Sequence, residues 1–166
     1  MAPTVPLLIP EVNADHLALL DAQPAAHGWK GRIITNPNCS TVVLCMALAP
    51  LRQFGLKTAL ITTLQAVSGA GYPGVPSWDI LANVIPFIGG GEEEKVETET
   101  PKILGAIEAE AITGHSVILS ATTTRVPGPH GHTGALADGP PPRPPPHPRP
   151  ARGPTHRGTA HAPASP

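Results

Sequence analysis

The stretch Ile33-Ile34-Thr35-Asn36-Pro37-Asn38-Cys39-Ser40-Thr41 decides how the chain folds, because a short β-branched run ends in it and a long apolar helical pattern begins. Pro37 and Asn38 are turn residues, so the predicted strand stops abruptly before the helix starts. Cys39 therefore lies at the expected N-terminus of a helix, where free backbone N–H groups and the helix dipole favour an anion. Since the thiolate is the reactive form of cysteine, this position predicts a nucleophile.

The residues beside Cys39 are suited to assist a nucleophile. The amide of Asn38 is a candidate hydrogen-bond donor to an oxyanion, and the backbone N–H groups that follow it are candidate co-donors. The alternative is that Cys39 is one of the many small buried cysteines that fill cores and do no chemistry. Cys45 follows six residues later in the same predicted helix, so the two thiols face different sides, and reduced thiols in a cytoplasmic protein are expected.

The composition of the 166 residues limits the class of protein. The length allows one ordinary domain. A formal net charge of −1 and a pI near 6.7 give no indication of binding to nucleic acid or to an anionic membrane. No apolar run approaches the roughly 20 residues that span a bilayer, and residues 1–10 lack the basic start and apolar core of a secretory signal. We expect no metal site.

Alternating strand and helix patterns predict an α/β (α+β) domain built on a mixed sheet. The expected strands are Val5–Ile9, Gly31–Thr35, Leu56–Leu64 and His115–Thr124. The expected helices are Ala14–Asp21, Ser40–Phe54 with a kink or end at Pro50, Trp78–Val84 and Glu92–Ile107. The loop after the third strand contains a formal G-x-G-x-x-G, but Pro73 prevents a helix from following it. A dinucleotide fingerprint requires that helix, so we reject this interpretation.

The composition changes sharply after Thr133. Leu136 is the only large aliphatic residue beyond that point, Asp138 is the last acid, and proline, arginine and histidine dominate the remainder. Such a segment cannot bury enough apolar surface to offset its conformational entropy. We therefore expect a folded domain over residues 5–133 and a disordered tail over residues 134–166. The tail is either a Pro-rich partner-binding segment or the product of a changed reading frame.

Several stretches, in order along the chain, carry a resemblance to one enzyme family. They are Val5–Asn13 (VPLLIPEVN), Thr35–Thr41 (TNPNCST), Gln65–Gly74 (QAVSGAGYPG), Ile85–Gly90 (IPFIGG) continuing through Glu92–Lys95, Thr122–Pro127 (TTTRVP) and Gly131–Thr133. The chain resembles aspartate-semialdehyde dehydrogenase of the archaeal and fungal type. The resemblance implies a partial catalytic and dimerisation domain, with the edge of a Rossmann half at its N-terminus.

The family's reaction is the reduction of L-aspartyl 4-phosphate to aspartate semialdehyde with NADPH, a step of lysine, threonine and methionine biosynthesis. It passes through an acyl-thioester on cysteine. By resemblance Cys39 is that cysteine, His132 is the acid/base, and Arg125 holds the substrate carboxylate as a bidentate fork. Such a reaction needs a thiolate, an oxyanion donor and a proton-transfer group, and Cys39, Asn38 and His132 supply these types.

Further roles follow from the resemblance alone. Gln65 orients the acyl group, Lys95 and Glu92 lie near the phosphate and amino ends of the substrate, and Ser68 and Gly69 touch NADP. The alternative for Lys95 is a solvated position on a charged helix face. The implied partners are a small-molecule substrate and a second copy of the chain in a homodimer.

The sequence also departs from the family. Members begin with a Rossmann half whose glycine-rich loop binds the NADP phosphates, whereas this chain starts just before Val5, and the family pattern is lost beyond Thr133. We therefore expect an inactive or impaired enzyme, with poor solubility or incomplete order. The alternative function is a non-catalytic fragment that acts as a dimerisation module or a Pro-rich interaction module. A sister enzyme such as a glyceraldehyde-3-phosphate or acetylglutamyl-phosphate reductase is disfavoured by the motifs around Cys39 and Gln65.

Overall fold

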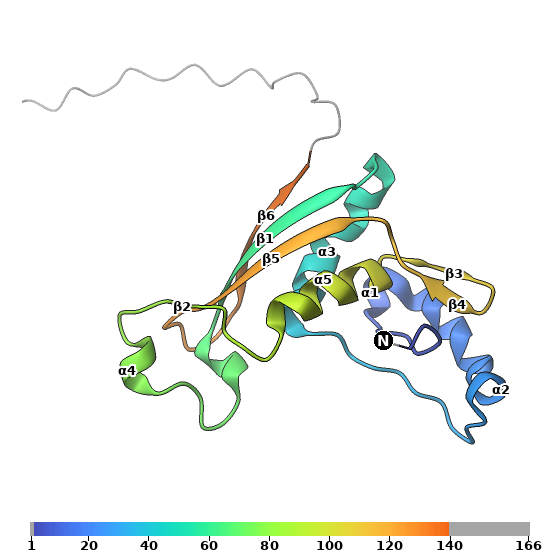
Figure 1. Ribbon diagram of the computed structural model, residues 1–166, viewed down its shortest axis with the longest axis horizontal. Coiled ribbons are helices and arrows are strands. Elements are labelled where there is room, and N and C mark those ends of the chain that lie inside the picture. Colours follow the sequence, from blue (N-terminus) through green and yellow to red (C-terminus); the bar gives the residue numbers. More distant parts are fainter. Residues whose placement is uncertain (1, 140–166) are drawn as a thin grey trace, which may run out of the picture.

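A four-stranded mixed sheet in the order β2-β5-β1-β6 forms the centre of the computed structural model, which describes residues 2–139 (Figure 1). The strands are β1 (Thr58–Gln65), β2 (Ile85–Pro86), β5 (Ile118–Arg125) and β6 (Thr133–Asp138). β1 runs parallel to β5, and it pairs with β6 in the antiparallel direction. β2 adds a short antiparallel pair at the end of β5. The α/β prediction with a mixed sheet is confirmed.

Two helices, α3 (Cys39–Leu48) and α5 (Glu92–Ile103), cover one face of this sheet. Every second residue of β1 is buried beneath them, as the period of a strand with one covered face requires. The core contains Leu44 and Leu48 from α3, Val96 and Ile103 from α5, and Ile61 from β1. The opposite face of the sheet is exposed over the described residues.

The N-terminal segment differs from its prediction. It forms α1 (Pro10–Asn13), the 3-10 helix η1 (Ala14–Asp21) and α2 (Gln23–His27). The expected strands Val5–Ile9 and Gly31–Thr35 are reduced to one parallel bridge between Leu7 and Thr35. Because residues 31–36 are exposed, no second layer covers them, and pairing stops after this bridge.

The predicted helix Ser40–Phe54 begins one residue earlier, at Cys39, and changes at Ala49 into the 3-10 helix η2 (Ala49–Phe54), as Pro50 suggested. The predicted helix Glu92–Ile107 ends at Ile103. A hairpin of β3 (Ala106–Glu108) and β4 (Ala111–Thr113) follows it. The hairpin was not predicted, because its turn places Ala109 and Glu110 at positive φ without the Asn or Gly that normally signals such a turn.

The boundary expected at residue 133/134 is too early. β6 continues to Asp138 and pairs along β1, with Leu136 opposite Ile61. Hydrogen bonds to β1 stabilise this strand despite its few apolar side chains, and Leu136 packs against the core. Residues 140–166, on which the remaining prediction of a disordered tail falls, lie outside the described part.

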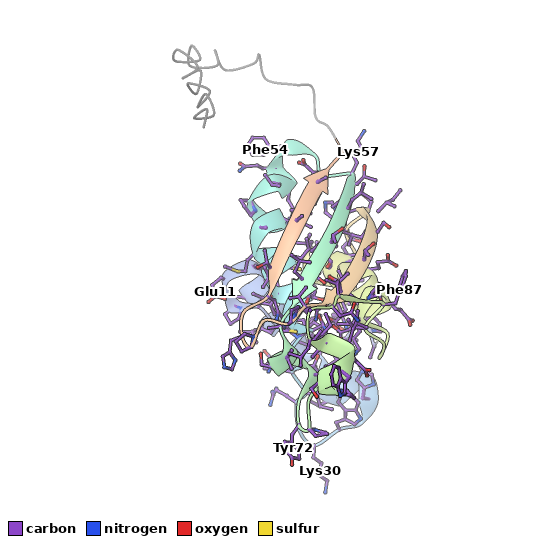
Figure 2. The ribbon with its side chains drawn as sticks, turned by 90° about the vertical axis from the view of Figure 1, so that its left-hand side faces the viewer. Glu11, Lys30, Phe54, Lys57, Tyr72 and Phe87 are labelled. Carbon is purple, nitrogen blue, oxygen red and sulfur yellow. The ribbon has the colours of Figure 1, made fainter. Side chains whose placement is uncertain are left out.

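The loop between β1 and β2 contains the 3-10 helix η3 (Val67–Ala70) and α4 (Ser77–Ile80). It carries Tyr72 to the end of the molecule opposite Phe54 and Lys57, which precede β1 (Figure 2). No α-helix follows the glycines of this loop directly, in agreement with the rejection of the dinucleotide fingerprint. Within residues 2–139 no helix is both long and apolar enough to cross a membrane.

Candidate functional site

Four segments converge at one edge of the sheet. Parallel strands β1 and β5 end together there, with Gln65 and Arg125 as register partners. α3 and α5 begin at the same edge, since Glu92, the first residue of α5, contacts both Gln65 and Asn38, the residue before α3. His132 immediately precedes β6. The fold thus brings the start of two helices to the carboxyl ends of two parallel strands, an arrangement that favours anion binding.

Cys39 is the first residue of α3, and its side chain is exposed. Asn38 caps the helix, because its Oδ1 accepts hydrogen bonds from the backbone N–H of Ser40 at 2.9 Å and of Thr41 at 3.3 Å. The first turn of α3 carries no acid. The predicted placement of a thiol at a helix N-terminus is confirmed.

Cys45 is the inert cysteine of the pair. It is fully buried. Burial raises the pKa of the Cys45 thiol from 9.0 to about 12; the neighbouring hydroxyl of Thr100 partly opposes this, and the charge of Glu99 adds to it. Cys45 therefore stays protonated at neutral pH, whereas the thiol of Cys39 is accessible to solvent.

Asn38 is held at two further points by α5. Its Nδ2 donates to Glu92 Oε2 at 2.9 Å, and its backbone N–H donates to Glu99 Oε2 at 2.7 Å. One of the two amide hydrogens is therefore already engaged, and the other is left for a ligand. The side-chain amide of Asn38 therefore caps α3 and links this helix to α5.

Gln65 is almost fully buried and is oriented from both sides. Its Oε1 accepts a hydrogen bond from Thr63 Oγ1 at 3.0 Å, so its Nε2 points to Glu92 Oε2, 3.4 Å away. The other carboxylate oxygen of Glu92 lies 3.4 Å from Nζ of the exposed Lys95. Glu92 thus joins the candidate residues Asn38, Gln65 and Lys95.

The backbone of a single residue, Ala66, holds both Arg125 and His132. Arg125 Nη1 donates to the Ala66 carbonyl at 2.8 Å, and the Ala66 N–H donates to His132 Nδ1 at 3.1 Å. Because an N–H group can only donate, Nδ1 must be the acceptor, and the neutral imidazole carries its proton on Nε2. The Nε2–H of the ring is therefore available as a hydrogen-bond donor.

Arg125 is a buried cation, with 7% of its surface exposed. Among residues 2–139 the salt bridges are Arg32–Asp21 and Lys95–Glu92, and none involves Arg125. A buried charge without a partner is costly unless an opposite charge joins it. The position is thus suited to an anionic ligand such as a carboxylate.

Ser68 and Gly69 are exposed on η3, directly over these two side chains. A Cβ atom added to Gly69 would lie 2.8 Å from Arg125 Nη1 and 2.9 Å from His132 Cε1. Only glycine lets the backbone pass this close. The backbone N–H of Ser68 donates to the Pro129 carbonyl at 3.2 Å, which fixes this loop to the one that carries His132.

All nine residues predicted from the sequence lie in this connected arrangement; they are Asn38, Cys39, Gln65, Ser68, Gly69, Glu92, Lys95, Arg125 and His132. Ser40 and His132 also line one small cavity of about 10 Å³. The sequence interpretation missed Thr63, the peptide of Ala66 and Glu99. Thr63 was detectable, since it shares the buried strand face with Gln65. Glu99 was also detectable, because it lies seven residues after Glu92 on the same helix face.

No group of three or more His, Cys, Asp or Glu side chains in residues 2–139 is arranged to hold a metal ion. For NADP, the exposed backbone of Ser68 and Gly69 over Arg125 and His132 fits the approach of the reactive end of a flat cofactor. The glycines after β1 do not start an α-helix, so they form no phosphate cradle of the Rossmann kind.

A family model described as "Semialdehyde dehydrogenase, dimerisation domain" matches residues 48–137, more than half of the chain. The chain therefore belongs to the semialdehyde dehydrogenases, of which it contains the dimerisation domain. The particular members that it is similar to include an aspartate-semialdehyde dehydrogenase of Archaeoglobus fulgidus, 52% identical over 136 residues. The match covers 82% of this chain and 39% of that protein, so the chain spans about two fifths of the relative's length.

Solved structures and a second relative extend the comparison. The crystal structure of aspartate semialdehyde dehydrogenase with NADP from Candida albicans superposes with a TM-score of 0.71 at 40% identity, over 87% of this chain and 42% of that one. A malonyl CoA reductase (NADP) of Metallosphaera sedula is 39% identical over 77% of this chain and 36% of its own length. The resemblance to archaeal and fungal aspartate-semialdehyde dehydrogenase is confirmed.

Proposed function

We propose that this chain supplies the acyl-transfer site of a dehydrogenase that reduces L-aspartyl 4-phosphate to aspartate semialdehyde with NADPH. The observation that carries the proposal is the buried Arg125 without an acidic partner in the described part, held with His132 by the backbone of Ala66 at the edge of the sheet where the exposed Cys39 begins α3. A cytoplasmic location, which keeps the thiol reduced, belongs to the same proposal.

Substrate binding rests on three charged side chains. The guanidinium of Arg125 pairs with the free carboxylate of the substrate, since its planar fork matches a carboxylate and no protein acid in the described part neutralises it. Glu92 receives the substrate ammonium. Lys95, at 3.4 Å from Glu92, then lies within reach of the phosphate.

The first step is attack by the Cys39 thiolate on the acyl carbon. The carbon–sulfur bond forms, the bond from carbon to the phosphate oxygen breaks, and the phosphate leaves with the electron pair. The backbone N–H of Cys39, which donates to no described residue, and the second amide hydrogen of Asn38 stabilise the developing oxyanion. Gln65, which Thr63 fixes in one orientation, holds the acyl group against them.

The second step converts the thioester to the aldehyde. NADPH would supply a hydride to the thioester carbon, and Ser68 and Gly69 are the described residues that would hold it. The Nε2–H of His132 donates a hydrogen bond to the oxyanion formed at that carbon; the oxyanion then re-forms the carbonyl as the carbon–sulfur bond breaks and the cysteine leaves as its thiolate.

The acylation step tests the proposal without the cofactor. The chain is mixed with freshly prepared L-aspartyl 4-phosphate and analysed by intact-protein and peptide mass spectrometry. We expect an aspartyl adduct on Cys39 that hydroxylamine removes, no adduct in Cys39→Ser, and roughly 100-fold slower acylation in Arg125→Lys because the bidentate pairing is lost. A chain that gains no adduct while its Cys39 still reacts with iodoacetamide would contradict the proposed substrate.

Malonyl-CoA is the second candidate acyl donor, because one relative is a malonyl CoA reductase (NADP). A malonyl group also has a free carboxylate for Arg125, but it has no ammonium for Glu92. The same experiment with malonyl-CoA separates the two. A malonyl adduct that forms faster than the aspartyl adduct would assign the site to the malonyl substrate.

We also propose that two copies of the chain associate through the open face of the sheet. Leu60 is 58% exposed and Leu64 44% exposed on β1, and Ile118 is 69% exposed on β5. Apolar side chains in such a row on a sheet face indicate a protein interface. A dimerisation module without catalysis is the alternative function, and it predicts association without acylation of Cys39.

A further inference from the structure

We propose that Glu99 is a positioning residue that fixes the first turn of α3 and, through it, Cys39. The proposal rests on the proposed role of Cys39 as the nucleophile. Glu99 lies two turns along α5 from Glu92 and touches none of the groups assigned to substrate or cofactor above. Its one hydrogen bond in the described part reaches the residue directly before Cys39.

The contact reproduces half of a capping box from a distant element. In a capping box, a Glu at the third helical position accepts a hydrogen bond from the backbone N–H of the capping residue. In α3 that third position is Thr41, whose buried hydroxyl has no partner in the described residues. Glu99 Oε2 takes its place and accepts from the Asn38 N–H at 2.7 Å across 61 residues of sequence.

The four carboxylates of α5 that reach other elements divide into two rows. Glu93 and Glu97 face β5 and accept from the backbone N–H groups of Thr123 and Ala121. Glu92 and Glu99 face α3. Glu92 accepts a hydrogen bond from the side-chain amide of Asn38, and Glu99 accepts one from its backbone N–H. Asn38 cannot rotate without breaking both contacts. Glu92 and Glu99 therefore fix the orientation of the backbone from which the Cys39 side chain projects.

The negative charge of the Glu99 carboxylate has an electrostatic cost, because the carboxylate lies beside α3. A negative charge beside α3 opposes thiolate formation, and it adds to the effect of burial on the Cys45 thiol. The hydrogen bond and the charge can be separated by substitution. Glu99→Gln removes the charge and keeps an acceptor oxygen, whereas Glu99→Ala removes both. The difference between these two variants therefore isolates the positioning effect.

The experiment measures the second-order rate of iodoacetamide alkylation of Cys39 from pH 5 to 9 in the full chain. We expect Glu99→Gln to react at least as fast as the wild type, and Glu99→Ala to react about tenfold more slowly than Glu99→Gln at pH 7, the effect of one hydrogen bond. Glu97→Ala is the matched control. It loses a similar bond from the same helix, to β5, and should keep the wild-type rate.

A second measurement separates a local effect from a failure to fold. Hydrogen exchange of the amides of Asn38, Ser40 and Thr41 should be faster in Glu99→Ala than in Glu99→Gln, with unchanged exchange in β1. Equal alkylation rates of the two Glu99 variants, with a wild-type rate above that of the urea-unfolded chain, would overturn the positioning role alone. A wild-type rate equal to that of the unfolded chain would overturn this role together with the proposed nucleophile.

Discussion

Ala66 shows how a residue without functional side-chain atoms can organise a site. Its carbonyl accepts a hydrogen bond from Arg125 and its N–H donates to His132, so the cation and the imidazole are both aligned by the backbone of one residue. Ala66 follows directly after Gln65, whose amide is fixed by Thr63. Three of the proposed site residues are thus positioned by Thr63 in β1 and by Ala66, which follows the strand, and little freedom is left to lose when a substrate binds.

Gly69 is a second residue that determines the site, because no side chain fits at this position over Arg125 and His132. In Gly69→Ala the added methyl would meet Arg125 Nη1 at 2.8 Å and His132 Nε2 at 3.0 Å, so one of these side chains must move. We expect the Ala66–His132 hydrogen bond to break and acylation of Cys39 by aspartyl phosphate to slow by roughly 100-fold. The tautomer and hydrogen bonding of His132 are measured by nitrogen NMR of the imidazole.

Gly128→Ala is the control for this substitution. Gly128 lies in the neighbouring loop, and a Cβ there would meet no atom within 4 Å. This variant should keep the wild-type imidazole spectrum and acylation rate. An unchanged His132 spectrum in Gly69→Ala would show that the loop moves instead of the side chains.

At the scale of the element, α5 protects an otherwise open strand edge. β5 pairs with β1 on one side, but on the other side β2 reaches only its last two residues, Thr124 and Arg125. The backbone N–H groups of Ala121 and Thr123 on this edge donate to Glu97 and Glu93, respectively. Unpaired strand edges invite association with other chains, and carboxylates over the N–H groups prevent it.

The carboxylate of Glu93 makes this protection dependent on pH. Burial alone would raise the pKa of Glu93, but hydrogen bonds from the Thr123 hydroxyl, from its own backbone and from the Thr123 N–H together outweigh burial and hold the pKa below 4.5. Because the pKa is lower in the folded state, the stabilisation is complete above pH 4.5 and is lost as the pH falls through the folded value.

Glu93→Gln should remove this pH dependence while leaving an acceptor for Thr123. We expect its free energy of unfolding in urea to be about 1 kcal/mol below that of the wild type at pH 7, and the difference to shrink towards zero below pH 4.5. Glu94→Gln is the control, because Glu94 is the exposed neighbour in the same turn. A constant difference between Glu93→Gln and wild type across this range would contradict the proposed ionic contribution.

For the whole molecule, the residues assigned to the site from the sequence lie together, whereas several elements of the fold differ from their prediction. Cys39 was identifiable from its position at the expected start of a helix, and Arg125 from the resemblance that its motif carries. The hairpin turn at Ala109 and Glu110 was not, since tertiary contacts impose its positive φ angles on residues without that preference. β6 was missed for a related reason: pairing with β1 is a property of the sheet, and the sparse apolar content of residues 134–138 did not signal it.

The uncovered face of the sheet leads to a prediction about assembly. The helices α3 and α5 cover one face only, and the other presents Leu60, Leu64 and Ile118 to solvent. Two copies that stack these faces would bury both apolar rows and give the sheet a second layer. We expect the full chain to be a dimer in sedimentation-velocity experiments at micromolar concentration.

Replacing both Leu60 and Ile118 by Lys places charges at the centre of the proposed interface, and we expect the dissociation constant of the dimer to rise by about 100-fold or more. Leu81→Lys is the control, because Leu81 is 63% exposed after α4, away from the sheet. It should leave the dimer intact. If the double variant sediments like the wild type, the open face does not form the interface. If the monomeric double variant still acylates Cys39, each chain carries its own complete acyl-transfer site.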